Sequence, residues 1–167
     1  AYANQPLIMG WNLARLAESL LPFFDADPDR AVDLANARLE AIAGTYRGEW
    51  LNVMRAKLGL LGEDAGDAVL ADDFVAAIQG VDWTMAFRRL AGAVQDDTAL
   101  LALFDDGTTL RAWLPRWRTR LRPDAAAAMS AVNPAVIPRN HLVEAALEAA
   151  TAGDMAPFEA LLAAVRD

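Results

Sequence analysis

The sequence predicts an all-α fold, and two features of the chain support this prediction. Apolar residues repeat at intervals of three and four along most of the 167 residues, which is the spacing of one face of a helix. No segment alternates apolar and polar residues as a half-buried strand does. Turn and capping residues interrupt the apolar stripes at short intervals, so we expect about seven or eight helices. They would pack as a single irregular bundle over residues 1–167.

The first half of the chain carries two apolar stripes. They comprise Leu13, Leu16, Ala17 and Leu20, followed by Leu39, Ile42, Tyr46, Trp50, Val53 and Leu58. Between them, Asp27 and Pro28 match an N-cap and the first helical position, where the missing N–H of proline costs nothing. Gly62 follows the second stripe, and glycine favours the left-handed backbone that ends a helix. Trp11 lies in the apolar segment before the first stripe, so we expect it to be buried.

The second half carries three further stripes. They comprise Trp83, Phe87, Leu90, Ala91 and Val94, then Leu110, Trp113, Leu114, Trp117 and Leu121, and finally Phe158, Leu161, Leu162 and Val165. We expect glycines to end helices and aspartates to cap the helices that follow, namely Gly80, Gly107 and Gly153, and Asp82, Asp106 and Asp154. Asn133 and Pro134 are interpreted as another helix start. Pro115 lies inside a stripe, where it either kinks the helix or begins a new one.

Composition excludes several classes of protein. An apolar content of 55% with 23% charged residues excludes a disordered tail. The chain has no cysteine and one histidine, which excludes disulfides, thiolate metal sites and sites with two imidazoles, and fits a cytoplasmic protein. The net charge of −8 argues against general nucleic-acid binding, which requires a basic footprint. The long uncharged stretches, residues 1–14 and 125–138, are interrupted by polar residues and proline, so neither a membrane span nor a signal peptide is predicted.

The acidic residues offer no convincing site. Asp25, Asp27 and Asp29 have the spacing of the first three ligands of a calcium-binding loop, but Arg30 and Asn36 occupy the positions of its glycine and glutamate. We therefore interpret the three aspartates as helix caps. Three acidic pairs are expected near helix ends, where negative charge stabilises the helix dipole: Asp72-Asp73, Asp96-Asp97 and Asp105-Asp106.

A locally basic segment raises the possibility of nucleic-acid binding. It contains Arg111, Arg116, Arg118, Arg120 and Arg122, interleaved with Trp113 and Trp117. Bases could stack on the tryptophans, but both fall on an apolar stripe. We therefore expect them in the core, and we expect the arginines to pair within the chain or with a partner protein. His141 lacks an identifiable serine or carboxylate partner and is interpreted as structural. No catalytic, cofactor-binding or metal-binding residues are assigned.

Several short segments together carry a family resemblance. They are Tyr2-Ala3-Asn4-Gln5-Pro6, Trp11-Asn12-Leu13-Ala14-Arg15-Leu16-Ala17, Lys57-Leu58-Gly59-Leu60, Asp82-Trp83-Thr84, Phe87-Arg88-Arg89-Leu90, Val132-Asn133-Pro134, Ile137-Pro138-Arg139-Asn140-His141, Val143-Glu144, Ala146-Leu147 and Gly153-Asp154. In their order and approximate spacing, they resemble the selenoprotein O family, also called YdiU. Its members are kinase-like protein adenylyltransferases.

The resemblance implies an enzyme that transfers AMP from ATP to protein hydroxyl groups. The family's ATP and Mg²⁺ ligands precede the equivalent of Tyr2, so none corresponds to a residue of this chain. The chain is then expected to be a non-catalytic C-terminal helical segment, resembling the C-terminal part of a kinase-like C-lobe. Its expected partners are the missing N-terminal kinase-like region and the protein substrates of the enzyme. Trp11 and Arg139 would be architectural, and Arg139 would need a carboxylate or carbonyl partner because it lies near a helix start.

Two other classes of function remain open at this point. The alternative to the segment is a stand-alone helical module that binds proteins and has no enzymatic activity. A start codon immediately upstream would favour the module, and several hundred preceding residues with kinase-like motifs would favour the segment. An independent hydrolase with a metal ion held by carboxylates would need clustered acids, which the sequence does not show.

Overall fold

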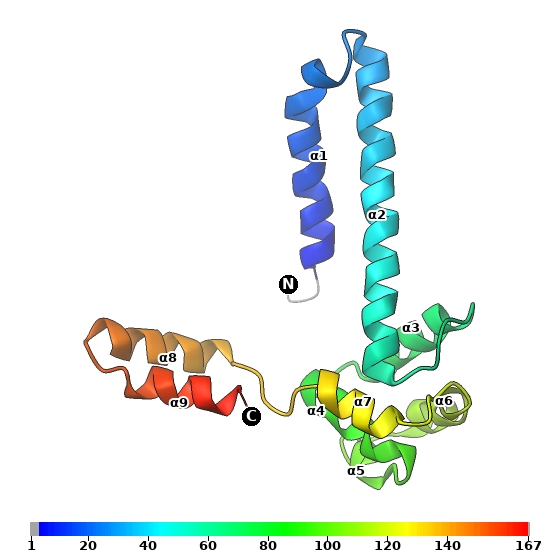
Figure 1. Cartoon of the computed structure of the whole chain (residues 1–167), viewed down its shortest axis with the longest axis vertical. Coiled ribbons are helices and arrows are strands. Elements are labelled where there is room, and N and C mark those ends of the chain that lie inside the picture. The colour runs from blue at the N-terminus through cyan, green and yellow to red at the C-terminus, as the bar shows by residue number, and fades with distance from the viewer. Residues whose placement is uncertain (1–3, 167) are drawn as a thin grey trace. The chain divides into compact units, whose positions relative to one another are not determined.

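The computed structural model describes residues 4–166, which form an all-α structure, as the sequence predicts (Figure 1). The elements are α1 (Gln5–Phe24), α2 (Pro28–Leu58), α3 (Asp67–Ala77), α4 (Trp83–Leu90), the 3-10 helix η1 (Gly92–Val94), α5 (Thr98–Leu101), α6 (Thr108–Arg118), α7 (Ala125–Val132), α8 (Asn140–Thr151) and α9 (Ala156–Ala164). Eight of the nine α-helices in this part of the chain have at least eight residues, in agreement with the predicted number. The chain divides into a first unit up to Val53 and a second unit from Met54 onward.

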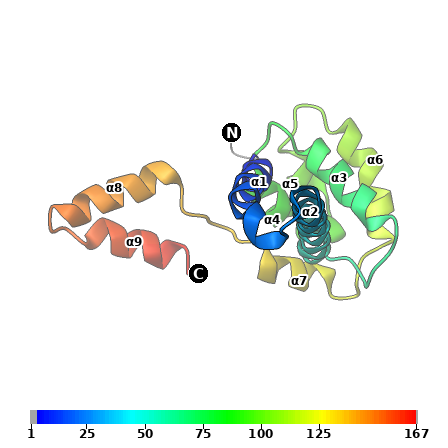
Figure 2. The same cartoon turned by 90° about the horizontal axis from the view of Figure 1, so that it is seen from above.

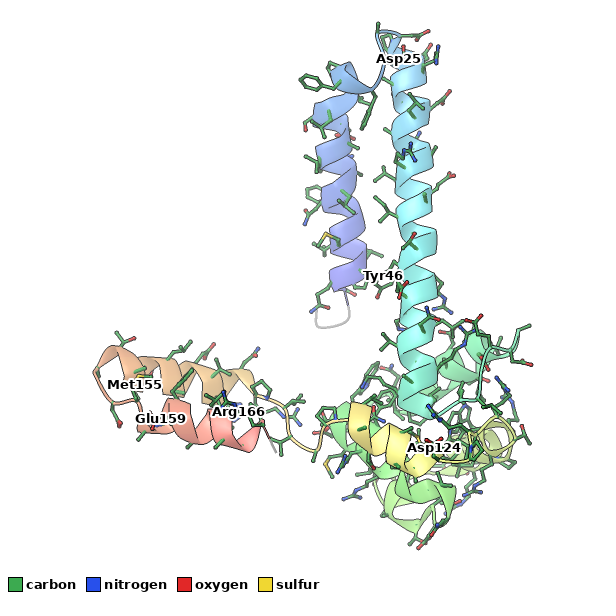
Figure 3. All side chains as sticks on the ribbon, viewed as in Figure 1. Asp25, Tyr46, Asp124, Met155, Glu159 and Arg166 are labelled. Carbon is green, nitrogen blue, oxygen red and sulfur yellow. The ribbon has the colours of Figure 1, made fainter. Side chains whose placement is uncertain are left out.

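The first unit is an antiparallel hairpin of α1 and most of α2 (Figures 1 and 2). The turn between the two helices contains Asp25, which is labelled in Figure 3. The Oδ1 atoms of Asp25 and Asp27 accept hydrogen bonds from the amides of Asp27 and Asp29, each at 3.0 Å. The aspartates therefore cap α2, which begins at Pro28 as predicted. Ala31 and Ala35 are buried in this unit.

Trp11 is exposed, contrary to the prediction that it is buried. Its relative exposure is 60%, and the Arg15 guanidinium lies 5.7 Å from the centroid of its ring. No residue of α1 is buried. The prediction was wrong because the apolar residues near Trp11 in the sequence lie on the same helix, α1, and residues of one helix do not bury each other. Within the first unit, α1 has only α2 to pack against, and one neighbouring helix covers one side.

The core of the second unit is built around aromatic side chains. Phe74 of α3 lies 4.8 Å from Trp113 and 5.1 Å from Phe87, between ring centroids. Trp113 stacks on Trp117 at 5.5 Å. Both indole N–H groups donate to backbone carbonyls, Trp113 to Leu70 at 2.8 Å and Trp117 to Leu58 at 2.7 Å. The prediction that the two tryptophans are core residues is confirmed.

Two proline positions are decided by the structure. α6 runs through Pro115 to Arg118, so this proline lies within a helix and does not begin one. The sequence suggested that Asn133 and Pro134 begin a helix, and this prediction is wrong. α7 ends at Val132, and the next helix, α8, begins at Asn140. Asn133 has an extended backbone, the conformation that a following proline favours.

Helices α8 and α9 form a second hairpin, visible in both cartoon views (Figures 1 and 2). Among the described residues of this hairpin, Ala146 is the buried one. Asp154 Oδ1 accepts a hydrogen bond from the amide of Ala156 at 3.0 Å. The sequence predicted Asp154 as the cap of α9, but the N-cap position of this helix is Met155. At the start of α8, Arg139 Nη2 lies 2.7 Å from Asp82 Oδ2, which is the carboxylate partner that the sequence required.

Replacing Trp117 by alanine should lower the free energy of unfolding by about 3–5 kcal/mol, because it empties a large core position. Trp11→Ala is the matched control and should cost less than about 1 kcal/mol in this chain, since Trp11 is exposed. Urea denaturation followed by near-UV circular dichroism measures both values. Equal losses for the two variants would contradict the assigned core.

Candidate functional site

Three of the family-like segments meet at the C-terminal end of α2. The last four carbonyl groups of an α-helix have no partner within the helix. Local backbone satisfies two of those in α2, since the amide of Leu60 donates to the Arg55 carbonyl at 3.0 Å and that of Gly59 to the Ala56 carbonyl at 3.2 Å. Gly59 has a φ of +66°, and a Cβ there would lie 3.0 Å from Cγ of Met129. Glycine is therefore required for this turn.

Side chains from distant segments satisfy the other two carbonyl groups. Asn133 Nδ2 donates to the carbonyl of Lys57 at 2.9 Å, and Trp117 Nε1 donates to the carbonyl of Leu58 at 2.7 Å. These partners lie 76 and 59 residues further along the chain. The end of α2 is thus capped by α6 and by the residue that follows α7.

Asn133 also connects α2 to α4. It is 1% exposed, and its Oδ1 accepts a hydrogen bond from Lys57 Nζ at 3.1 Å. Its carbonyl accepts a hydrogen bond from Arg88 Nη1 at 3.1 Å. Lys57 Nζ lies 4.8 Å from the centroid of the Phe87 ring, and burial lowers the pKa of this lysine. Three of the family-like segments therefore meet in one hydrogen-bonded cluster, which we call the Asn133 cluster (Lys57, Phe87, Arg88 and Asn133).

A buried carboxylate forms a second cluster on the same helix end. Asp67 of α3 is fully buried. Arg55 Nε donates to its Oδ2 at 2.9 Å, Arg120 Nε donates to its Oδ1 at 3.1 Å, and the amide of Asp64 donates to Oδ2 at 2.9 Å. Burial alone would raise the pKa of Asp67, but the bonds from Arg120, Arg55 and Asp64 outweigh it and hold the pKa below 3.8. Asp67 is therefore a charged structural tie between α2, α3 and the segment after α6.

Sequence reasoning missed the role of Asp67. An aspartate in the first turn of a helix is common because it stabilises the helix dipole, so nothing in the local pattern distinguished it. Asn133 carried a signal, since it belongs to a segment that resembles the family. The sequence pattern led us to interpret Asn133 as the start of a helix, whereas its side chain caps the end of α2.

The basic segment binds carboxylates of the same chain, as predicted. Its ion pairs are Arg116 with Asp73 at 2.8 Å, Arg118 with Asp97 at 2.8 Å, Arg120 with Asp67 at 3.1 Å and Arg122 with Asp124 at 2.6 Å. Arg118 Nη2 also donates to the carbonyl of Ala93 at 2.9 Å. The side chains of this segment therefore link α6 and the following loop to α3 and to the region of η1 and α5.

The acidic pairs have structural contacts. Asp96 and Asp106 each accept hydrogen bonds from the hydroxyl and the amide of a threonine two residues later, and these bonds lower the pKa of both carboxyl groups. The prediction that all three pairs lie near helix ends is wrong for Asp72-Asp73, which lie in the middle of α3. His141 is exposed in the first turn of α8. Within residues 4–166, no three acidic or histidine side chains are close enough to hold a metal ion together.

An apolar groove runs between α1 and α2 in the first unit. It has a volume of about 550 Å³, and its walls include Pro6, Met9 and Leu13 from α1 and Ile42 and Tyr46 from α2. Figure 3 shows Tyr46 on the side of α2 that faces the start of α1. Asn4, Gln5 and Pro6 of the first family-like segment belong to this end of the hairpin, while Tyr2 and Ala3 lie outside the described residues.

The family model and two similar relatives of this chain indicate one and the same family. The family model of protein adenylyltransferase SelO matches residues 1–166. The chain is 59% identical over 169 residues to protein nucleotidyltransferase YdiU of Cereibacter sphaeroides, an alignment that covers 100% of the chain and 35% of that protein. It is 49% identical over 174 residues to the protein of the same name from Rhizobium etli, with 97% of the chain and 35% of that protein covered. The chain thus spans about a third of the length of these relatives.

Asn133→Ala should lower the free energy of unfolding by about 1–3 kcal/mol, because it leaves the part-buried carbonyl of Lys57 without its side-chain donor. Asn140→Ala is the control, since Asn140 is exposed, and should have an effect within about 0.5 kcal/mol. Chemical denaturation at pH 7 measures both. A neutral result for Asn133→Ala would show that water or another donor replaces the amide.

Asp67→Asn should cost about 3–5 kcal/mol at pH 7, because it removes the buried negative charge that the partly buried Arg55 and Arg120 share. The pKa of Asp67 is lowered on folding, so its contribution is complete above 3.8 and is lost as the pH falls below that value. The difference between wild type and variant should therefore shrink as the pH falls below 3.8. Asp124→Asn, which removes an exposed pair, should cost less than about 1 kcal/mol. A difference between wild type and Asp67→Asn that does not depend on pH would refute the assigned charge.

Proposed function

The chain belongs to the SelO family of protein adenylyltransferases, and we propose that it is a non-catalytic C-terminal helical segment of an enzyme that transfers AMP from ATP to protein hydroxyl groups. The observation that carries the proposal is the family match over residues 1–166 in a chain that spans 35% of the length of its relative. Most of the sequence of such a relative therefore lies outside the matched region.

The roles of the charged side chains support a structural segment. Four arginines of the basic segment bind aspartates of the same chain, and Asp67 forms two ion pairs. Asp25, Asp27, Asp82 and Asp154 accept backbone hydrogen bonds at helix starts. Side chains engaged in this way stabilise the fold, whereas a catalytic acid or base needs access to the reacting atoms.

In this proposal the ATP and Mg²⁺ ligands lie in the N-terminal kinase-like region of the same polypeptide. A hydroxyl oxygen of the protein substrate attacks the α-phosphorus of ATP, the bond to the β,γ-pyrophosphate breaks, and the hydroxyl proton is released. The present chain contributes the helices that follow that region in the polypeptide. We further propose a cytoplasmic location, which the absence of cysteine favours. No helix among residues 4–166 is long and apolar enough to cross a membrane.

The apolar groove of the first unit favours one alternative, a stand-alone helical module that binds other proteins. The coding sequence upstream separates the two proposals. Several hundred preceding residues with kinase-like motifs support the segment, and a start codon immediately before this chain supports the module.

The chain alone should bind Mg–ATP with a Kd no tighter than about 1 mM, so that 1 mM ligand stabilises it by no more than about 0.4 kcal/mol. Isothermal titration calorimetry and thermal unfolding with Mg–ATP check both values. A polypeptide that includes the preceding kinase-like region is the positive control and should bind much more tightly. Micromolar, magnesium-dependent affinity of the chain alone would contradict the proposal.

A further inference from the structure

Helix α1 presents large apolar side chains in several directions. Successive residues of a helix point about 100° apart, so Leu7, Ile8 and Met9 face three different ways. All three are more than half exposed, at 76%, 53% and 58%. Trp11 and Phe23 add exposed aromatic surface. Among the 20 residues of α1, only Arg15 and Glu18 are charged.

Such a helix is not suited to contact with water. A helix at a protein surface carries polar residues on the face opposite its apolar stripe, and a helix that is apolar all round is enclosed by protein or lipid. No helix in the described part of the chain, α1 included, is long and apolar enough to cross a membrane. Protein is therefore the covering that fits the exposed side chains of α1.

Helix α2 differs from α1 in this respect. Its apolar stripe, which includes Ile42 and Tyr46, faces α1 and the groove. Asp33, Ala37 and Glu40 lie on another side of the helix, and all three are exposed. Position 37 follows position 33 by one turn and precedes position 40 by three residues, so the three share one face. This face has the polar character expected of a solvated surface.

We propose that α1 is a buried helix of the longer protein, and that the remaining part of the same polypeptide covers the groove and the outer sides of α1. The chain spans about a third of the length of its relatives. A polypeptide of their length would therefore contain about two thirds of its residues outside this chain. A second copy of the hairpin could cover one stripe, but it would leave other sides of α1 in water. This inference rests on the proposed function for the existence of the longer polypeptide, and it adds the surface through which the two parts join.

Covalent footprinting with a carbene reagent tests the proposal on the unmodified proteins. In the chain of residues 1–167, Leu7, Ile8 and Trp11 should be labelled strongly, in line with their exposure. In the full-length polypeptide their labelling should fall to the level of Trp117, which is buried in the second unit. Ala37, on the polar face of α2, should be labelled equally in both and serves as the internal control. Unchanged labelling of Trp11 in the full-length polypeptide would overturn the proposal.

A pair of variants provides a second, independent measurement. Trp11→Lys should change the Tm of the isolated chain by less than about 2 °C and lower that of the full-length polypeptide by at least about 5 °C. Ala37→Lys should have a small effect in both proteins. If Trp11 is already protected in the isolated chain, and sedimentation shows a dimer that dissociates on dilution with loss of that protection, the occupant is a second copy and the proposal is wrong.

The same material separates this inference from the proposed function. A full-length polypeptide that transfers AMP while Trp11 stays labelled would refute the docking surface and leave the function standing. A full-length polypeptide that protects Trp11 and transfers no AMP would refute the function and leave the docking surface standing.

Discussion

The need to satisfy the last carbonyl groups of α2 organises the second unit. Trp117 reaches the end of this helix from α6 and Asn133 reaches it from beyond α7, and each brings its neighbours with it. Arg55, in the same helical turn, fixes α3 through Asp67. A helix end normally meets solvent, a glycine turn or a nearby cap. Here it is the point at which three other segments of the fold are joined.

The sequence was sufficient for the fold class and for many local features. The stripes placed Trp113 and Trp117 in the core, and the capping rules identified Asp27 and Asp82, because these depend on residues within one helical turn. It was insufficient for Asp67 and Asn133. The partners of Asn133 lie 76 residues away, and no local periodicity reports which distant helix end a side chain will reach.

The position of Trp11 shows a different limit of sequence reasoning. The rule that a tryptophan among apolar residues is buried failed for a hairpin in which α1 has one neighbouring helix. The segments that resemble the family also have a physical explanation. Lys57, Arg88 and Asn133 belong to these segments, and their side chains join α2, α4 and the residue that follows α7.

The capping of α2 by Asn133 has a consequence for the order of folding. The ribosome adds residues in sequence, so the amide that caps Lys57 is synthesised 76 residues after the carbonyl that it binds. Closing so large a loop is entropically unfavourable until other contacts have formed. A nascent chain that ends before residue 133 lacks this cap, and we expect the last turn of α2 to fray in such intermediates. We therefore expect the last turn of this helix to become fully ordered only after α7 has been synthesised.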